Sequence, residues 1–481
     1  MSIRAGVISA VSWLSFGNFM VRALALATMP VLTHYLSPLA YGEAALVGTV
    51  VSLITVFALS GIDMGYVRHA LTGQLGSSAA IEVFCWRWTL AGAGTVATLA
   101  GVLWWARADV FGLPASLAGF VTLGIIASAL ATLAQTRARL QGRYVRMSWA
   151  QLVTGCVSAA ASLGIAIGWR QDAWSLLVAM VLGYILPPLL LGVPSWRRLA
   201  SPSGLQRPER RRLLSTGLAG VITAPAYWAL SNSDRWFLAV FHGTTTVGIY
   251  SLGVTVGTVG AVVSAAVTSA WLPELARAES ASDDRSDGDK AGAVQLLAAL
   301  LMIVAVAVVA AGGDVIRALA DPRFHSAGVV VPFLAAGVLF YGCLQVGNSL
   351  LILAGKLHWA GFSWFVALLV SLLMNRWLVP AYGVWGAAVT QAASFLLVMV
   401  LVWVAALQFD PLRLPWLRLG AGFALSTAVA ALMQTPWSPV AWHSLVLKLP
   451  MGLAFSAVCL WIMTPKTFAA GLRRLDCRYA R

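Results

Sequence analysis

Apolar blocks of about 20 residues recur along the whole chain, and short polar loops separate them. A helix of that length and composition crosses the hydrocarbon core of a bilayer. The blocks are centred near residues 20, 54, 94, 125, 158, 183, 226, 259, 302, 341, 368, 395, 425 and 454. The pattern predicts an all-α polytopic membrane protein with about 14 transmembrane helices.

The amino-acid composition also indicates a membrane protein. Apolar residues make up 60% of the 481 residues and charged residues 10%. A soluble core would not hold this many apolar residues, because single domains stop growing near about 250–300 residues. The longest polar stretches, 195–212 and 276–290, are too short to fold alone. We therefore expect no catalytic or signalling domain outside the membrane.

The placement of the basic residues predicts the orientation. Loops on the N-terminal side of the spans hold 23 of the 32 lysines and arginines, the opposite loops hold four, and five lie inside spans. Basic loops stay in the cytoplasm, so both termini are predicted to be cytoplasmic. The net charge of +15 then reflects topology and anionic lipid headgroups, and nucleic acid is not an expected partner.

Sequence signatures of enzymes and cofactor sites are missing. The chain has no phosphate-binding loop, no HExxH, no CxxC and no GxSxG motif. Its five cysteines have no metal-binding spacing. We therefore expect neither catalysis, nor a cofactor, nor a bound metal.

A weak internal repeat indicates two lobes. At a shift of 206 residues, Leu32 aligns with Leu238, Gly42 with Gly248, and Leu46 with Leu252. Both segments are short turns with a glycine near the start of the next helix. The repeat predicts two six-helix lobes of parallel topology, related by a pseudo-two-fold axis, with a substrate cavity between them. The predicted divisions are residues 1–200, 201–410 and 411–481, the last holding two extra spans and a cytoplasmic tail.

Charged side chains inside spans are costly and mark functional sites. Arg22 lies near the middle of the first span, one turn after Asn18. Asp234 and Arg235 lie in the seventh, close to Asn232, and their adjacency makes mutual neutralisation unfavourable. If the first and seventh spans face each other, Arg22 and Arg235 line the cavity about 10 Å apart in depth.

Other polar positions are weaker candidates. Asn375 and Arg376 lie near the outer end of the eleventh span. Asp63, Arg68 and Arg87 lie near the cytoplasmic ends of spans and are candidates for gating or ion coupling, although Arg87 is also placed to pair with Glu82. Lys448 is expected to extend its amine to the membrane surface.

The intramembrane charges are mainly cationic, and arginine binds phosphate oxygens through two parallel hydrogen bonds. This excess of positive charge inside the spans favours an anionic cargo such as a lipid diphosphate headgroup. Buried carboxylates would instead favour a cation exporter.

Four motifs resemble the polysaccharide-exporting flippases of the Wzx type, which share a superfamily with the multidrug and toxin extruders. These are the turn Tyr35-Leu-Ser-Pro-Leu-Ala-Tyr-Gly42, the span end Ser60-Gly-Ile-Asp-Met-Gly65, the pair of segments Ser233-Asp-Arg235 and Val247-Gly-Ile-Tyr-Ser-Leu252, and the pair Leu378-Val-Pro-Ala-Tyr-Gly383 and Gly386-Ala-Ala-Val-Thr390. They occur in the family's order, over about residues 6–410.

The resemblance implies a MATE-like, alternating-access bundle in the bacterial inner membrane. It implies a cargo of oligosaccharide on undecaprenyl diphosphate, moved to the outer leaflet, with membrane lipids and the polymerase and co-polymerase of the same pathway as partners. In that family cationic residues line the central cavity. The resemblance therefore implies that Arg22, Arg235 and Arg376 bind the diphosphate and acidic sugars. Asp63 and Asp234 are the candidates for proton or sodium coupling.

Three alternatives remain open at the sequence level. A multidrug or small-molecule antiporter would have the same fold. A flippase for a peptidoglycan precursor would differ only in cargo. A polysaccharide polymerase or ligase would need a large external loop, whereas the longest here, around residues 314–327, is short and holds only Arg317, Arg323 and His325 as candidates.

Overall fold

The computed structural model describes the chain except for residues 1–2, 73–76, 107–112, 201–203, 266–284, 410–411, 413 and 465–481. Across the described residues the regular structure is helical, with no strand. The chain divides into two compact units, one made of residues 1–251 and 372–387 and the other of residues 252–371 and 388–481.

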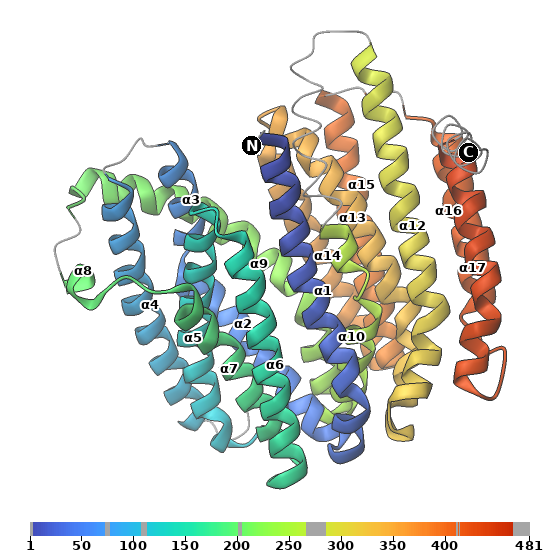
Figure 1. The fold of residues 1–481 in the computed structure, drawn as a ribbon, viewed down its shortest axis with the longest axis horizontal. Helices are drawn as coiled ribbons and strands as arrows, with labels where there is room; N and C mark the ends of the chain where they lie inside the picture. Colours follow the sequence, from blue (N-terminus) through green and yellow to red (C-terminus); the bar gives the residue numbers. More distant parts are fainter. Residues whose placement is uncertain are drawn as a thin grey trace, which may run out of the picture. The chain divides into compact units, whose positions relative to one another are not determined.

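The first unit contains the helices up to α9 and most of α10. Their bounds are α1 (Ile3–Tyr35), α2 (Pro38–Leu59), α3 (Ile62–Thr72), α4 (Ser78–Ala106), η1 (Ala115–Leu117), α5 (Ala118–Leu140), α6 (Tyr144–Gly168), α7 (Trp174–Leu191), α8 (Trp196–Ala200), α9 (Arg207–His242) and α10 (Thr244–Gly257). Within this unit α6 packs against α1 and α7, and α5 packs against α2, α4 and α7 (Figure 1).

The second unit is built around α12. Its remaining elements are α12 (Arg285–Leu319), η2 (Pro322–Val330), α13 (Val331–Leu353), α14 (Leu357–Tyr382), α15 (Val384–Phe409), α16 (Trp416–Met433) and α17 (Ala441–Met463), of which α14 ends and α15 begins in the first unit. Helix α12 packs against α13, α16 and α17 (Figure 1). The two C-terminal helices, α16 and α17, are therefore integral to this unit.

Twelve helices of the described chain are long and apolar enough to cross a membrane. They correspond to all the expected spans except the two centred near residues 226 and 259. The first of these two falls on α9, a helix of 36 residues that carries the polar segment Ser231–Arg235. The second falls on the end of α10, a helix of 14 residues, and the residues that follow. The protein is thus a multi-pass membrane protein.

The predicted repeat is visible as a reciprocal contact between α2 and α10. A Cβ atom at Gly42 would overlap the carbonyl oxygen of Thr244, and one at Gly248 would overlap the carbonyl oxygen of Pro38. Thr244 lies 206 residues after Pro38, and Gly248 lies 206 residues after Gly42. The contact of Gly42 with Thr244 is therefore matched by an equivalent contact of Gly248 with Pro38, as expected for surfaces related by a two-fold axis. Glycine at both positions lets the two backbones touch.

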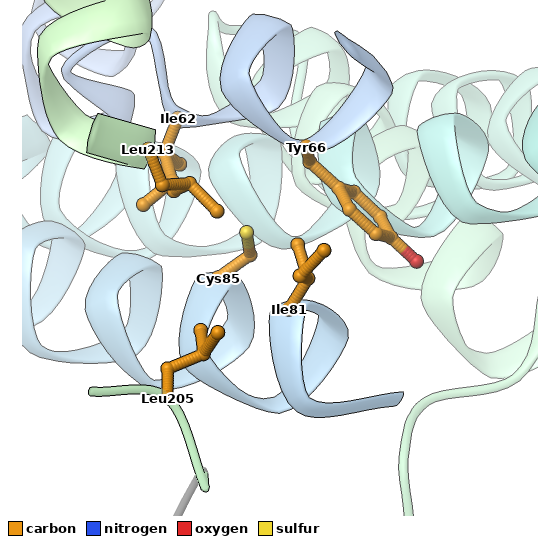
Figure 2. Close-up of a cluster of buried hydrophobic side chains, with 6 residues drawn as sticks. All are labelled: Ile62, Tyr66, Ile81, Cys85, Leu205 and Leu213. Carbon is orange, nitrogen blue, oxygen red and sulfur yellow. The ribbon is translucent and has the colours of Figure 1, made fainter. Parts of the chain in front are cut away.

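The chain turns sharply between α2 and α3. Ser60 and Gly61 both have positive φ values, 50° and 67°, and end α2. Helix α3 then packs against α4 and α9 through a buried cluster. The cluster consists of Ile62, Tyr66, Ile81, Cys85, Leu205 and Leu213 (Figure 2). It joins α3 and α4 to the start of α9 and its preceding loop.

Two arginines on either side of the loop between α5 and α6 have structural roles, Arg137 in the last turn of α5 and Arg146 in the first turn of α6. Arg137 Nη1 donates to the carbonyl oxygen of Gly192 at 3.0 Å. Arg146 donates through Nε and Nη2 to the carbonyl oxygen of Leu190, at 3.0 and 2.7 Å. These carbonyls lie at the C-terminal end of α7, where a helix has unpaired acceptors and partial negative charge. These two arginines therefore stabilise the C-terminal end of α7.

The expectation that Lys448 reaches the membrane surface is wrong. Its side chain is 4% exposed, and Nζ lies 2.8 Å from Asp314 Oδ2 and 3.1 Å from the carbonyl oxygen of Ala310. Ser444 and Arg317 also donate to the Asp314 carboxylate. Asp314 and Arg317 lie in α12 and not in the predicted external loop. This buried ion pair joins α17 to α12.

Replacing Lys448 with Met is expected to destabilise the second unit by about 3 kcal/mol, because it leaves a buried carboxylate with fewer donors. Thermal unfolding in detergent measures the effect. The exposed residue Lys356 provides the control substitution, Lys356→Met. Equal melting temperatures for the two variants would contradict a buried ion pair at Lys448.

Candidate functional site

The polar segment of α9 forms the centre of the candidate site. Helix α9 continues through Ser231–Arg235 without a break, so consecutive side chains point in different directions around its axis. Ser233 and Asp234 are buried, at 5% and 2% exposure. Asn232 and Arg235 are half-buried. Backbone hydrogen bonds are satisfied within the helix, which leaves only the side chains in need of partners.

Asp234 is held by neutral donors. The Tyr250 hydroxyl on α10 donates to Oδ2, and the backbone N–H of Arg235 donates to Oδ1 at 2.8 Å. No lysine or arginine within the described part of the chain forms an ion pair with this carboxylate. The adjacent Arg235 guanidinium forms no salt bridge with it, although the positive charge of Arg235 acts on the carboxylate.

Arg235 is oriented by an amide instead of a carboxylate. Its Nη1 donates to Asn232 Oδ1 at 2.6 Å, and Asn232 Nδ2 donates to the Trp228 carbonyl oxygen at 3.0 Å. Nε of Arg235 is buried and has no hydrogen-bond partner among the described residues. The guanidinium is thus fixed in place by a neutral group and keeps both its charge and an unused donor.

Helix α14 contributes Asn375 to the same cluster. Asn375 is 1% exposed, and its Nδ2 lies 3.5 Å from Ser233 Oγ. Its Oδ1 is buried without a hydrogen-bond partner among the described residues. The neighbouring residue Arg376 is exposed, with its guanidinium carbon 5.5 Å from the centre of the Phe241 ring. The structure therefore brings Asn375 to the cluster and places Arg376 against the end of α9.

Arg22 and Asn18 lie on α1, which packs against α6. Arg22 is half-buried, and exposed Asn18 accepts a hydrogen bond from Gln151 Nε2 at 3.4 Å. Helix α9, which carries Arg235, packs against α2 and α3. The arrangement of Arg22 and Arg235 on opposite sides of a cavity stays a prediction.

The candidate gate residues are dispersed. Asp63 lies in the first turn of α3, outside the twelve apolar helices, and burial raises the pKa of its carboxyl above the ordinary value. Arg68 and Arg87 are exposed. Glu82 pairs with Arg137 at 2.8 Å. This partner comes from α5, which packs against α4.

Tyr250 was not among the sequence candidates. It is fully buried and lies 16 residues after Asp234. The turn between α9 and α10 reverses the chain so that the two side chains meet. A buried tyrosine needs a hydrogen-bond partner, and Tyr250 lies in the motif Val247-Gly-Ile-Tyr-Ser-Leu252 that accompanies Ser233-Asp-Arg235, so both signals were present in the sequence. Across the described residues no group of three or more His, Cys, Asp or Glu side chains is arranged to hold a metal ion.

A family model described as polysaccharide biosynthesis protein matches residues 31–327, more than half of the chain. No curated protein matches at a significant level.

Solved membrane transporters share the fold at low sequence identity. The lipid II flippase MurJ in an inward-closed conformation has 12% identity and a TM-score of 0.70, covering 93% of this chain and 98% of that one. A eukaryotic MATE transporter has 13% identity and a TM-score of 0.56, covering 89% and 100%. A MOP-superfamily transporter from Pyrococcus furiosus has 11% identity and a TM-score of 0.57, covering 85% and 96%. These likenesses confirm the predicted MATE-like fold.

Replacing Tyr250 with Phe is expected to destabilise the protein by about 1–3 kcal/mol, because a buried carboxylate loses a donor. Thermal unfolding in detergent measures the effect, with the exposed residue Tyr382 changed to Phe as the control. A Tyr250→Phe melting temperature equal to that of the control would show that Tyr250 does not stabilise the Asp234 carboxylate.

Proposed function

The chain belongs to the polysaccharide biosynthesis protein family, and on that premise we propose that it is a flippase for a lipid-linked oligosaccharide. The cargo is an oligosaccharide on undecaprenyl diphosphate, moved from the cytoplasmic to the outer leaflet of the bacterial inner membrane. The product supplies the assembly of a surface polysaccharide, such as O-antigen, capsule or exopolysaccharide. The transport is not catalysis, since no bond is made or broken.

One observation supports an anionic cargo above the others. The Arg235 guanidinium lies in a helix of the transmembrane bundle with no carboxylate partner among the described residues, and its buried Nε has an unused donor. Removing such a group from water is expensive unless a ligand compensates. Phosphate oxygens accept charge-assisted hydrogen bonds from guanidinium, and these are the strong ones. A diphosphate headgroup completes the hydrogen bonding of Arg235.

The remaining candidates take supporting roles in this proposal. Asn232 orients Arg235, and the free Oδ1 of Asn375 accepts a hydrogen bond from a sugar hydroxyl. Arg22 and Arg376 provide further positive charge for the diphosphate and acidic sugars. Asp234 and Asp63 are the carboxylates available for coupling to a proton or sodium gradient.

Direction and orientation follow from the charge pattern. Both termini are placed in the cytoplasm by the basic loops on that side. The protein alternates between two facings, and the difference in cargo affinity between those facings sets the direction of net transport. Membrane lipids surround the protein, and the polymerase and co-polymerase of the same pathway receive the cargo.

Replacing Arg235 with Ala is expected to lower the flipping rate by roughly 10- to 100-fold, the equivalent of one charge-assisted hydrogen bond to the headgroup. The measurement is flipping of a fluorescent undecaprenyl-diphosphate oligosaccharide in proteoliposomes. Arg235→Lys keeps the charge but loses the planar fork, so an intermediate rate is expected. The exposed residue Arg418 on α16 provides the matched control, Arg418→Ala.

Each outcome is informative about the cargo. Flipping that survives Arg235→Ala unchanged would retain the function and reject this site. No flipping above protein-free liposomes with an oligosaccharide cargo, but flipping of a peptidoglycan precursor, would assign that cargo instead. No flipping of either lipid under imposed ion gradients would favour a small-molecule antiporter.

A further inference from the structure

The second unit contains a hydrophobic cavity that the proposed function does not use. The cavity lies among α12, α13, α15 and α16 and has a volume of about 520 Å³. Each residue that lines it is hydrophobic or a glycine, such as Met302 on α12 and Phe340 on α13. The indole N–H of Trp403 in its wall donates to the Cys343 carbonyl oxygen at 3.0 Å, so it is not available to a ligand. The lining therefore requires an apolar occupant.

The cavity occupies one half of the membrane thickness. On α15 its lining runs from Leu396, at the middle of the helix, to Leu407, 11 residues later and near the C-terminal end. On α16 the lining runs from Trp416, the first residue, to Phe423 near the middle. The stretch on α15 corresponds to about 16 Å, roughly half of a hydrocarbon core of about 30 Å. The cavity thus extends from the membrane face at which α15 ends and α16 begins to the centre of the bilayer.

The cavity is open along α15 and α16. Val400, Val404 and Phe423 line it and are 45%, 53% and 42% exposed. Water does not fill an apolar cavity, because it finds no hydrogen-bond partners there. An empty cavity loses the packing contacts of its lining. Since all four helices are long and apolar enough to cross a membrane, hydrocarbon from the surrounding bilayer is the medium that fills the cavity without either cost.

We propose that this cavity, called here the chain groove, binds one acyl chain of a membrane phospholipid. A phospholipid places its headgroup at the membrane face and its chain along half of the hydrocarbon core, which is the extent of the chain groove. A cavity of about 300–1,000 Å³ suits a ligand of this size. The undecaprenyl chain of the proposed cargo is much longer and would extend beyond the groove. The basic loops predict that this face is cytoplasmic, so the phospholipid comes from the cytoplasmic leaflet.

The chain groove gives α16 a role. Helix α16 packs against α12 and α17, and it contributes Trp416, Leu419, Gly420 and Phe423 to the groove. A Cβ atom at Gly420 would meet no atom within 4 Å. The glycine therefore leaves room that a larger residue would take from the acyl chain. This inference depends neither on the cargo nor on the direction of transport.

The test uses a phospholipid that carries a photoreactive diazirine on its acyl chain, in proteoliposomes of the whole chain. After irradiation, peptide mass spectrometry locates the adducts. Adducts are expected on Met302 and Phe340, which are 5% and 7% exposed and line the chain groove. Gly420→Phe is expected to lower these adducts by about fivefold or more, because its ring fills the groove. Adducts on Leu453 of α17, which is 71% exposed, are expected to stay unchanged.

The matched control is Gly164→Phe on α6, where a Cβ atom also meets no atom within 4 Å. It is expected to leave the Met302 adducts unchanged. Adducts confined to exposed residues such as Leu453 in the unmodified protein would overturn the proposal, whether or not Gly420→Phe folds. Met302 adducts that a folded Gly420→Phe variant retains would overturn it as well.

A competition distinguishes the two lipid chains. Undecaprenyl phosphate at an amount equal to that of the photoreactive phospholipid is expected to leave the Met302 adducts in place. Loss of these adducts would assign the groove to the cargo's tail and overturn the phospholipid site. Flipping is not measured, so failure of the proposed function and failure of the chain groove are separate results.

Discussion

The account depends on one constraint, that an arginine lies in a membrane helix without an acidic partner among the described residues. Arg235 is half-buried, and a charge inside a helical membrane bundle needs partners from protein, cargo or a water-filled cavity. Asn232 supplies one acceptor and Asp234 does not supply another. The charge is therefore oriented by a neutral amide and forms no salt bridge among the described residues, which leaves it available to an anion.

The surrounding helices make this arrangement rigid. Helix α9 carries the polar segment, and its Trp228 and Trp236 donate hydrogen bonds to Ser52 and Thr49 of α2. The buried cluster of α3, α4 and the start of α9 fixes the segment near Gly217 (Figure 2). In the second unit, the buried ion pair of Asp314 and Lys448 holds α17 against α12. Polar contacts of the described residues thus serve two purposes, because some hold helices together and others orient the Arg235 guanidinium.

The sequence was sufficient for the fold and for the main polar cluster. Hydrophobic blocks of membrane length predicted the spans, and the glycines at positions 42 and 248 predicted a repeat that the structure shows as a reciprocal contact. The adjacency of Asp234 and Arg235 predicted that the two side chains point in different directions around their helix, and they form no salt bridge. Each of these inferences uses only local spacing, which a single sequence contains.

Side-chain partners distant in the sequence were not predictable. Lys448 pairs with a residue 134 positions away, and its expected reach to the surface was wrong because α17 packs with that face against α12. Glu82 pairs with Arg137 of α5, because α5 packs against α4. Tyr250 meets Asp234 only after the chain reverses between α9 and α10. Such pairs depend on packing, which periodicity does not encode.

The most direct test of the central claim is equilibrium binding of three lipids that differ only in their headgroup, undecaprenol, undecaprenyl phosphate and undecaprenyl diphosphate. Native mass spectrometry of the purified protein measures all three in one competition. The account predicts that the diphosphate binds most tightly and that Arg235→Ala removes this preference while leaving undecaprenol binding unchanged. Equal binding of undecaprenol and the diphosphate by the unmodified protein would contradict it.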